Sequence, residues 1–103
     1  MDRRTSHRAK VDLLVNRFLD GRPYMCRVTD ISATGLRLQP LLEPRTPTRF
    51  MGLQLELPVS GGAIVTASAE VVDDAGARAG IGVRFTQLGP DSERALRLFV
   101  GAN

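Results

Sequence analysis

The stretch MGLQLEL, residues 51–57, decides the fold because its apolar and polar residues alternate without a break. Methionine or leucine stands at each odd position, and glycine, glutamine or glutamate stands at each even position. In an extended chain these two sets point to opposite faces. A helix would instead repeat its apolar residues every three or four positions. The stretch therefore predicts a β-strand with one buried face.

Similar alternation recurs on both sides of this stretch, in 11–15, 24–28, 36–38, 63–71 and 79–85. Turn or loop signals separate the segments. These signals are Asp20-Gly21-Arg22-Pro23, the three prolines of 40–47, 58–62 and Asp73-Asp74-Ala75-Gly76. Six short strands joined by such turns predict an antiparallel sheet. Closure into a small barrel is its most economical form, because closure leaves no strand edge open.

The last segment, 90–101, changes to the period of a helix. Pro90 suits a first helical turn, and Asp91 and Glu93 lie near the positive end of the helix dipole. Four apolar residues recur at helical spacing, namely Ala95, Leu96, Phe99 and Val100. Gly101 then ends the pattern. We expect one short helix whose apolar stripe closes an open end of the barrel.

The predicted fold class is therefore all-β, a six-stranded antiparallel β-barrel with a C-terminal α-helix. All of 1–103 forms one domain, with a flexible basic arm at 1–10, the barrel at 11–86 and the helix at 90–101. The composition, 43% hydrophobic and 24% charged, is that of a soluble globular protein. No segment is apolar enough to predict membrane insertion or a signal peptide.

The single cysteine, Cys26, rules out an internal disulfide and favours a cytoplasmic location. Because Cys26 falls on the apolar face of its strand, we expect it to be an inert core thiol.

Charge is concentrated at the amino end. Four of the 14 basic residues lie in the first ten positions, accompanied by one of the 11 acidic residues, so the remaining chain is neutral overall. A general nucleic-acid binder needs a basic stripe across a folded surface, and this sequence has none. A short basic arm suits one compact anion. Taken alone, it is equally an ordinary solvated arm.

A second candidate feature is the stretch VTDISATG, residues 28–35. Asp30 and Ser32 stand two positions apart, so an extended chain would point a carboxylate and a hydroxyl the same way. Gly35 permits a tight turn or a close backbone approach. By itself the stretch fits an ordinary Asx or Ser turn between two strands.

Arg4 and Arg8, as Arg-x-x-x-Arg, followed after one hairpin by the Asp-x-Ser-x-x-Gly of residues 30–35, resemble the PilZ domain, the bacterial receptor module for cyclic di-GMP. The resemblance covers essentially the whole chain and implies a six-stranded barrel with a C-terminal helix. The segment from Gly80 to Phe85 also resembles the closing strand of the family, Gly-x-Gly-Val-x-Phe. It implies a backbone role for its two glycines, Gly80 and Gly82, near the ligand.

The resemblance implies a ligand-binding set for cyclic di-GMP, namely Arg3, Arg4, Arg8, Asp30, Ser32 and Gly35. A guanidinium can donate two hydrogen bonds to guanine O6 and N7 or to phosphate, and a carboxylate can accept from guanine N1–H and N2–H. Arg3, just before the arginine pair, favours a stacked pair of ligands. His7 acts as a spacer within the pair. We expect the arm to become ordered around the ligand and an unidentified downstream protein to detect the change.

Other functions fit the sequence less well. The only histidine is His7, and no residues have metal-ligand spacing, so neither an enzyme nor a metal or cofactor site is expected. Aromatic residues make up 5% of the chain, too few for a base-stacking surface for nucleic acid. The alternative is a PilZ-type protein-interaction module that does not depend on nucleotide binding.

Overall fold

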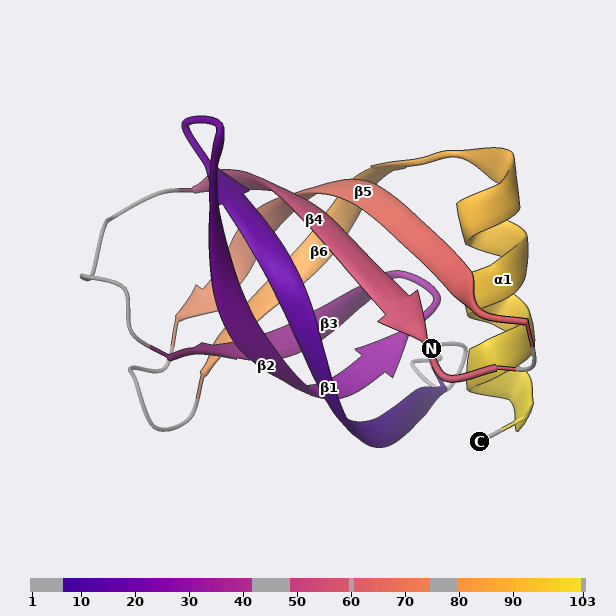
Figure 1. Cartoon of the computed structure of the whole chain (residues 1–103). Coiled ribbons are helices and arrows are strands. Elements are labelled where there is room, and N and C mark those ends of the chain that lie inside the picture. Colours follow the sequence, from indigo (N-terminus) through magenta and orange to yellow (C-terminus); the bar gives the residue numbers. More distant parts are fainter. Residues whose placement is uncertain (1–6, 42–48, 60, 75–79, 103) are drawn as a thin grey trace.

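The computed structural model describes residues 7–41, 49–59, 61–74 and 80–102. These residues form six strands and one helix (Figure 1). The elements are β1 (Arg8–Leu19), β2 (Arg22–Ser32), β3 (Gly35–Pro40), β4 (Phe50–Leu57), β5 (Ala63–Asp74), β6 (Ile81–Leu88) and α1 (Pro90–Ala102). The strands close into a barrel, and every neighbouring pair is antiparallel. The predicted barrel with a C-terminal helix is confirmed.

Strand order around the barrel is β1-β2-β3-β6-β5-β4 and thus differs from chain order. β3 pairs with β6, and β4 pairs with both β1 and β5. As a result β2, β3, β6 and β5 stand next to one another on one side of the barrel wall. Residues separated by 40 or more positions in the sequence meet there, and this wall carries the candidate site.

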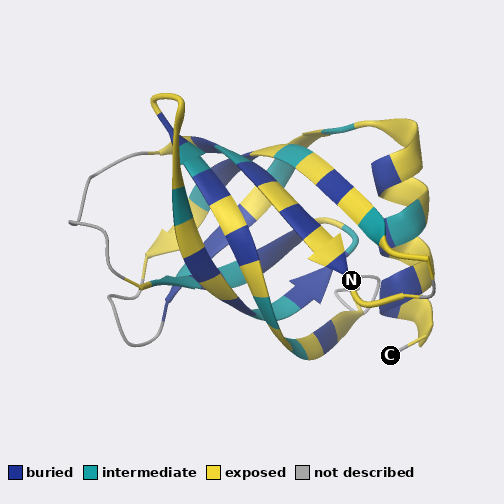
Figure 2. Ribbon diagram, viewed as in Figure 1, coloured by how far each residue is buried: buried dark blue, intermediate teal, exposed yellow. Residues whose placement is uncertain are grey.

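Buried residues alternate with exposed ones along the strands (Figure 2). Every strand contributes to one interior core, for example through Val15, Val28, Leu38, Leu55, Val65 and Val83. Burial of this apolar surface is the main force that holds the barrel together. In β4 the odd-numbered residues of MGLQLEL are all buried, so the predicted inward face is confirmed.

The helix α1 packs against one end of the barrel (Figure 1). Its apolar stripe, Leu96, Phe99 and Val100, is buried as predicted. The hydroxyl of Ser92 accepts a hydrogen bond of 3.2 Å from the backbone N–H of Thr66, which ties the helix to β5. The helix continues to Ala102, one residue past the predicted end.

The first strand begins at Arg8, three residues earlier than the predicted start at position 11. Ala9 is 2% exposed and pairs with Ile31 of β2, while Arg8 and Lys10 on either side face outward. Alanine carries little strand preference, so the apolar alternation is not evident before Val11. Arg8 is consequently part of the barrel and not of a flexible arm.

The turn signals were correct in kind but not always in extent. Asp20 and Gly21, with φ of 52° and 78°, form the two-residue loop between β1 and β2, as an Asp-Gly pair predicts. The expected turn at Asp73 and Asp74 is wrong at its start, because β5 runs to Asp74 and both residues pair with β6. Ala79, expected to face the interior, lies outside the described residues.

A register shift in β2 sets the orientation of Asp30. Val28 and Ile31 are both fully buried although they are three positions apart. The pairing with β3 shifts between Val28 and Asp30, which marks a β-bulge. The extra residue keeps Asp30 on the outer surface while the strand continues toward the turn.

Candidate functional site

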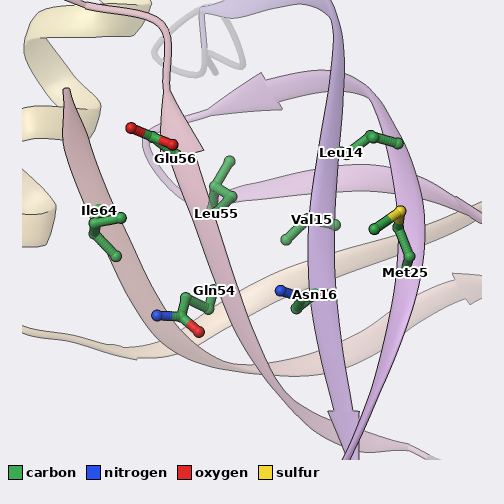
Figure 3. A pocket seen from close by; sticks show the side chains of 8 residues that line it. All are labelled: Leu14, Val15, Asn16, Met25, Gln54, Leu55, Glu56 and Ile64. Atoms are coloured by element: carbon green, nitrogen blue, oxygen red, sulfur yellow. The ribbon is translucent and has the colours of Figure 1, made fainter.

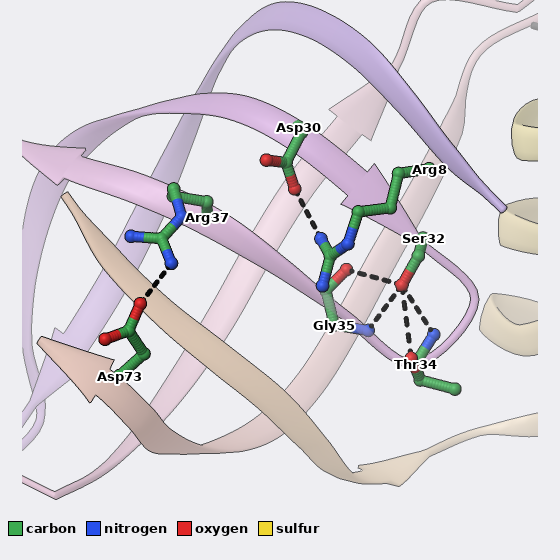
Figure 4. A network of polar contacts seen from close by, with 7 residues as sticks. All are labelled: Arg8, Asp30, Ser32, Thr34, Gly35, Arg37 and Asp73. Carbon is green, nitrogen blue, oxygen red and sulfur yellow. Dashed lines mark hydrogen bonds and ion pairs between the residues drawn. The ribbon is translucent and has the colours of Figure 1, made fainter. Parts of the chain in front are cut away.

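Ser32 organises the turn between β2 and β3 from a fully buried position. Its hydroxyl oxygen accepts hydrogen bonds from the backbone N–H groups of Thr34 at 3.1 Å and Gly35 at 3.2 Å. The hydroxyl also donates to the Gly35 carbonyl and lies 3.2 Å from the Thr34 hydroxyl. These contacts use its hydrogen-bonding capacity inside the turn (Figure 4).

Gly35 is required by the contact between β3 and β6. A Cβ atom at this position would lie 2.1 Å from the Val83 carbonyl oxygen and 3.2 Å from the Cα of Arg84. The first distance is far shorter than any van der Waals contact. The close backbone approach expected at Gly35 therefore exists, and the neighbouring group is a strand of the same barrel.

Arg8 and Asp30 form an ion pair between β1 and β2. The Arg8 Nη1 donates to the Asp30 Oδ1 at 2.5 Å, and the side chains are 51% and 25% exposed. Strand pairing sets this geometry, because Arg8 lies opposite Ser32 and Lys10 lies opposite Asp30. The structure thus brings together one residue from each predicted half-motif.

A second ion pair that the sequence analysis did not anticipate lies beside the first. Arg37 of β3 is the cross-strand neighbour of Asp30, and its Nη2 donates to Asp73 Oδ2 of β5 (Figure 4). The Arg37 Nη1 also donates to the Gly80 carbonyl at 3.3 Å. No sequence signal predicts the Arg37–Asp73 contact, because it depends on β6 lying between β3 and β5.

Gly82 of β6 provides the space in which the Arg37 side chain reaches Asp73. A Cβ atom on Gly82 would lie 3.2 Å from Arg37 Nη2 and 3.3 Å from the Asp73 Cβ. Gly80 has a φ of 86°, and a Cβ there would lie 2.7 Å from the Leu38 carbonyl oxygen. The packing around Arg37 and β3 thus accounts for Gly82 of β6 and for Gly80, which directly precedes β6.

The two ion pairs flank a pocket of about 280 Å³. Its lining residues are Arg8, Asp30, Leu36, Arg37, Val72, Asp73, Gly82 and Val83. Two guanidiniums and two carboxylates therefore face a small volume. Guanidiniums bind phosphate or guanine acceptors through paired donors, and carboxylates accept from guanine donors. Of the predicted site residues, Arg8 and Asp30 line this pocket, whereas Ser32 and Gly35 lie in the adjoining turn.

The remaining predicted arginines, Arg3 and Arg4, lie outside the described residues. His7 is exposed and lines a different pocket of about 410 Å³ together with Ala33 and Arg97. The structure therefore places His7 next to the helix α1 and the β2–β3 turn, and not among the residues that line the pocket between the two ion pairs.

A three-residue charge cluster adjoins the site, formed by Glu70 of β5, Arg84 of β6 and Arg49, which directly precedes β4. Glu70 accepts hydrogen bonds from Arg84 at 2.6 Å and from Arg49 at 2.7 and 3.0 Å. The bond from Arg84, followed by the bond from Arg49, holds the pKa of the Glu70 carboxyl below its usual range. Arg84 lies opposite Gly35, so the cluster borders the β2–β3 turn.

A pocket of about 290 Å³ on another part of the barrel has different chemistry (Figure 3). Three of its lining side chains, Leu14, Met25 and Ile64, are more than half exposed. Of the eight residues around it, only Glu56 is charged. This pocket lacks the guanidiniums that an anionic ligand requires.

Cys26 is fully buried in the barrel, as predicted. Burial raises the pKa of the thiol, and the nearby Arg17 guanidinium offsets part of that rise. In the described part of the chain, no three histidine, cysteine or acidic residues are grouped to hold a metal ion. None of the described helices is long and apolar enough to cross a membrane.

Fold and site together define a small antiparallel β-barrel with a charged pocket on its wall. The model of the PilZ domain family matches residues 2–102, so the chain belongs to the PilZ family, whose members are receptor or adaptor modules. The structure is similar to that of the inhibitor of motility from Bacillus subtilis (MotI/DgrA), with a TM-score of 0.80 and 16% identity. That match covers 99% of this chain but only 51% of the other protein. No curated protein sequence matches the chain.

Proposed function

We propose that this chain is a receptor for cyclic di-GMP, the ligand that its motifs imply. One observation carries the proposal: Arg8 and Asp30, 22 positions apart, meet on the wall of one pocket. Cyclic di-GMP offers phosphate and guanine acceptors to the guanidinium, and it offers guanine N–H donors to the carboxylate. The two residues thus match complementary groups of the same ligand.

Ligand binding would exchange one set of partners for another. In the free protein the guanidinium of Arg8 and the carboxylate of Asp30 satisfy each other. A ligand that carries both acceptors and donors can separate the pair without leaving either charge unpaired. Because the Arg8 side chain is half exposed, the pair contributes little to stability, and its separation costs little.

The pocket is too small for a whole cyclic dinucleotide. Its volume of about 280 Å³ lies just below the range of about 300–1,000 Å³ that is usual for small-molecule sites. We therefore infer that the pocket holds one end of the ligand, and that Arg3 and Arg4 contact the rest. Arg3 further suggests a stacked pair of ligands.

Signalling in this proposal depends on the segment before β1. Arg8 is anchored in the barrel, so the ordering that the sequence analysis expected of positions 1–10 is now proposed for residues 1–6 alone. Their arrangement around the ligand would change the shape and charge of one face. An unidentified downstream protein would bind that face, without nucleic acid, a cofactor or enzymatic chemistry.

Isothermal titration calorimetry with cyclic di-GMP tests the binding site. Arg8→Ala and Asp30→Ala should each weaken binding by about tenfold or more, as expected for the loss of charged hydrogen bonds. Arg27 and Asp12 offer a matched control, because they form a similar exposed pair, at 2.9 Å, across the same two strands. Arg27→Ala should leave the affinity unchanged. Equal affinities for all of these proteins would disprove the site.

A second candidate function is protein contact independent of nucleotide. The exposed Leu14, Met25 and Ile64 around the pocket of about 290 Å³ favour it, because such apolar groups suit a protein partner (Figure 3). A thermal shift assay separates the two functions. The receptor should melt at a higher temperature with cyclic di-GMP, whereas a nucleotide-independent module should not.

A further inference from the structure

A row of charges crosses four adjacent strands of the barrel wall. In the strand register, Asp30 of β2 lies opposite Arg37 of β3, and Arg37 lies opposite Gly82 of β6. Gly82 in turn lies opposite Asp73 of β5. Side chains at such positions share one face and lie within contact distance. Because Gly82 has no side chain, the Arg37 guanidinium crosses above it to Asp73, and Arg37 has a carboxylate on each side.

Only one of the two neighbouring carboxylates forms an ion pair with Arg37. Asp30 pairs with Arg8, and Asp73 pairs with Arg37. The Asp73 side chain is 52% exposed and that of Arg37 is 29% exposed. Exposed ion pairs stabilise a fold weakly, so separating Arg37 from Asp73 costs little free energy.

We propose that Arg37 is a further phosphate-binding residue of this pocket and that Asp73 is an internal competitor for it. In the free protein the Asp73 Oδ2 accepts from the Arg37 Nη2, and a phosphate oxygen takes this donor when ligand binds. The inference rests on the proposed function and concerns the same pocket. It adds a fourth guanidinium to those of Arg3, Arg4 and Arg8, placed by the barrel and not by the Arg-x-x-x-Arg motif.

Three points support this role. Carboxylate and phosphate oxygens both accept charged hydrogen bonds from a guanidinium, so a phosphate oxygen can take the donor that Asp73 now occupies. Arg37 also donates to the Gly80 carbonyl, a contact that holds the side chain along the pocket when Asp73 leaves. Asp73 also places a negative charge beside the pocket, which opposes an anionic ligand.

The competition predicts opposite effects for the two partners. In calorimetry with cyclic di-GMP, Arg37→Gln should weaken binding by about tenfold or more, because a charged hydrogen bond is lost. Asp73→Asn should tighten binding by roughly two- to fivefold, the worth of an exposed ion pair. The control variants Arg27→Gln and Asp12→Asn remove charges from the other exposed pair and should leave the affinity unchanged.

The outcomes separate this inference from the proposed function. If the wild type binds and both Arg37→Gln and Asp73→Asn weaken binding, the pair only supports the wall, and the competition is disproved. If the wild type binds and Arg37→Gln has no effect, Arg37 does not contact the ligand. If the wild type gives no heat and no thermal shift, the proposed function fails and this inference fails with it. Circular dichroism melts of each variant verify that it is folded.

Discussion

Arg8 and Asp30 form an ion pair 2.5 Å long between the first and second strands, although 22 positions separate them in the sequence. The pair is exposed on the outer wall, where a charge pair stabilises a fold by about 0.2–1 kcal/mol. We therefore expect Arg8→Ala to change the free energy of unfolding by less than about 1 kcal/mol while it strongly reduces ligand binding. Urea denaturation measures the first effect and calorimetry the second. A loss of several kcal/mol would instead make Arg8 a structural residue.

Ser32 should show the opposite behaviour, because its hydroxyl is buried and bonded inside the turn. Ser32→Ala leaves the N–H groups of Thr34 and Gly35 without this acceptor and should cost about 1–3 kcal/mol in urea denaturation. Ser68 is an exposed serine on β5, and Ser68→Ala is the matched control, with an expected change near zero. Equal effects of the two substitutions would contradict the role of Ser32 in the turn.

Gly35 and Gly52 provide a pair of strand glycines in contrasting surroundings. A Cβ atom at Gly35 would clash with the Val83 carbonyl at 2.1 Å, whereas one at Gly52 would meet the Phe18 Cβ at an ordinary 3.6 Å. Gly35→Ala should therefore destabilise the barrel by about 1–3 kcal/mol or more. Gly52→Ala should be tolerated. Thermal melts of both variants test the comparison, and a stable Gly35→Ala protein would exclude a tight β3–β6 contact.

Acid stability should depend on Glu70. Hydrogen bonds from Arg84 and Arg49 hold its pKa below the usual range, so the unfolded chain takes up this proton at a higher pH than the folded chain does. The resulting stability is complete above the ordinary glutamate pKa of about 4.3 and is lost as pH falls through the lower folded value.

Urea denaturation between pH 7 and pH 3 measures this dependence. Glu70→Gln should flatten the decline in stability, and Arg84→Gln should flatten it more than Arg49→Gln, because the bond from Arg84 has the larger effect on the pKa. An unchanged slope in Glu70→Gln would show that other groups account for the acid sensitivity.

Most of the fold follows from local patterns in the sequence. Alternation of apolar and polar residues indicates the buried face of a strand directly, and Leu53, Leu55 and Val83 all face the interior as predicted. The start of β1 was missed because Ala9, its first buried residue, is small and has little strand preference.

The candidate site was only partly predictable, because its contacts depend on strand order. Arg8 and Asp30 were identified through the motif, but their mutual ion pair follows from the pairing of β1 with β2. The contact between Arg37 and Asp73 requires β6 to lie between β3 and β5, which no local pattern indicates. Ser32 and Gly35 were predicted to bind the ligand, and that role stays a prediction; their contacts in the structure are those of a turn and of strand packing.

The buried thiol of Cys26 offers a test that joins the core to the site. Cys26 is fully buried, burial raises the pKa of its thiol, and it is the one cysteine of the chain. A thiol reagent should therefore react only when the barrel opens. A ligand that binds only the closed barrel lowers the open population, by about a hundredfold at a ligand concentration a hundred times Kd.

Cyclic di-GMP should thus slow the labelling of Cys26 in the native wild-type protein, measured by mass spectrometry over time. In Arg8→Ala the same concentration of ligand should slow labelling much less, because its affinity is lower. Rapid labelling without ligand would show that the barrel interior is accessible. If cyclic di-GMP binds by calorimetry but leaves the labelling rate unchanged, the ligand does not distinguish the closed barrel from the open one. The site would then not depend on the strand pairing that joins Arg8 to Asp30.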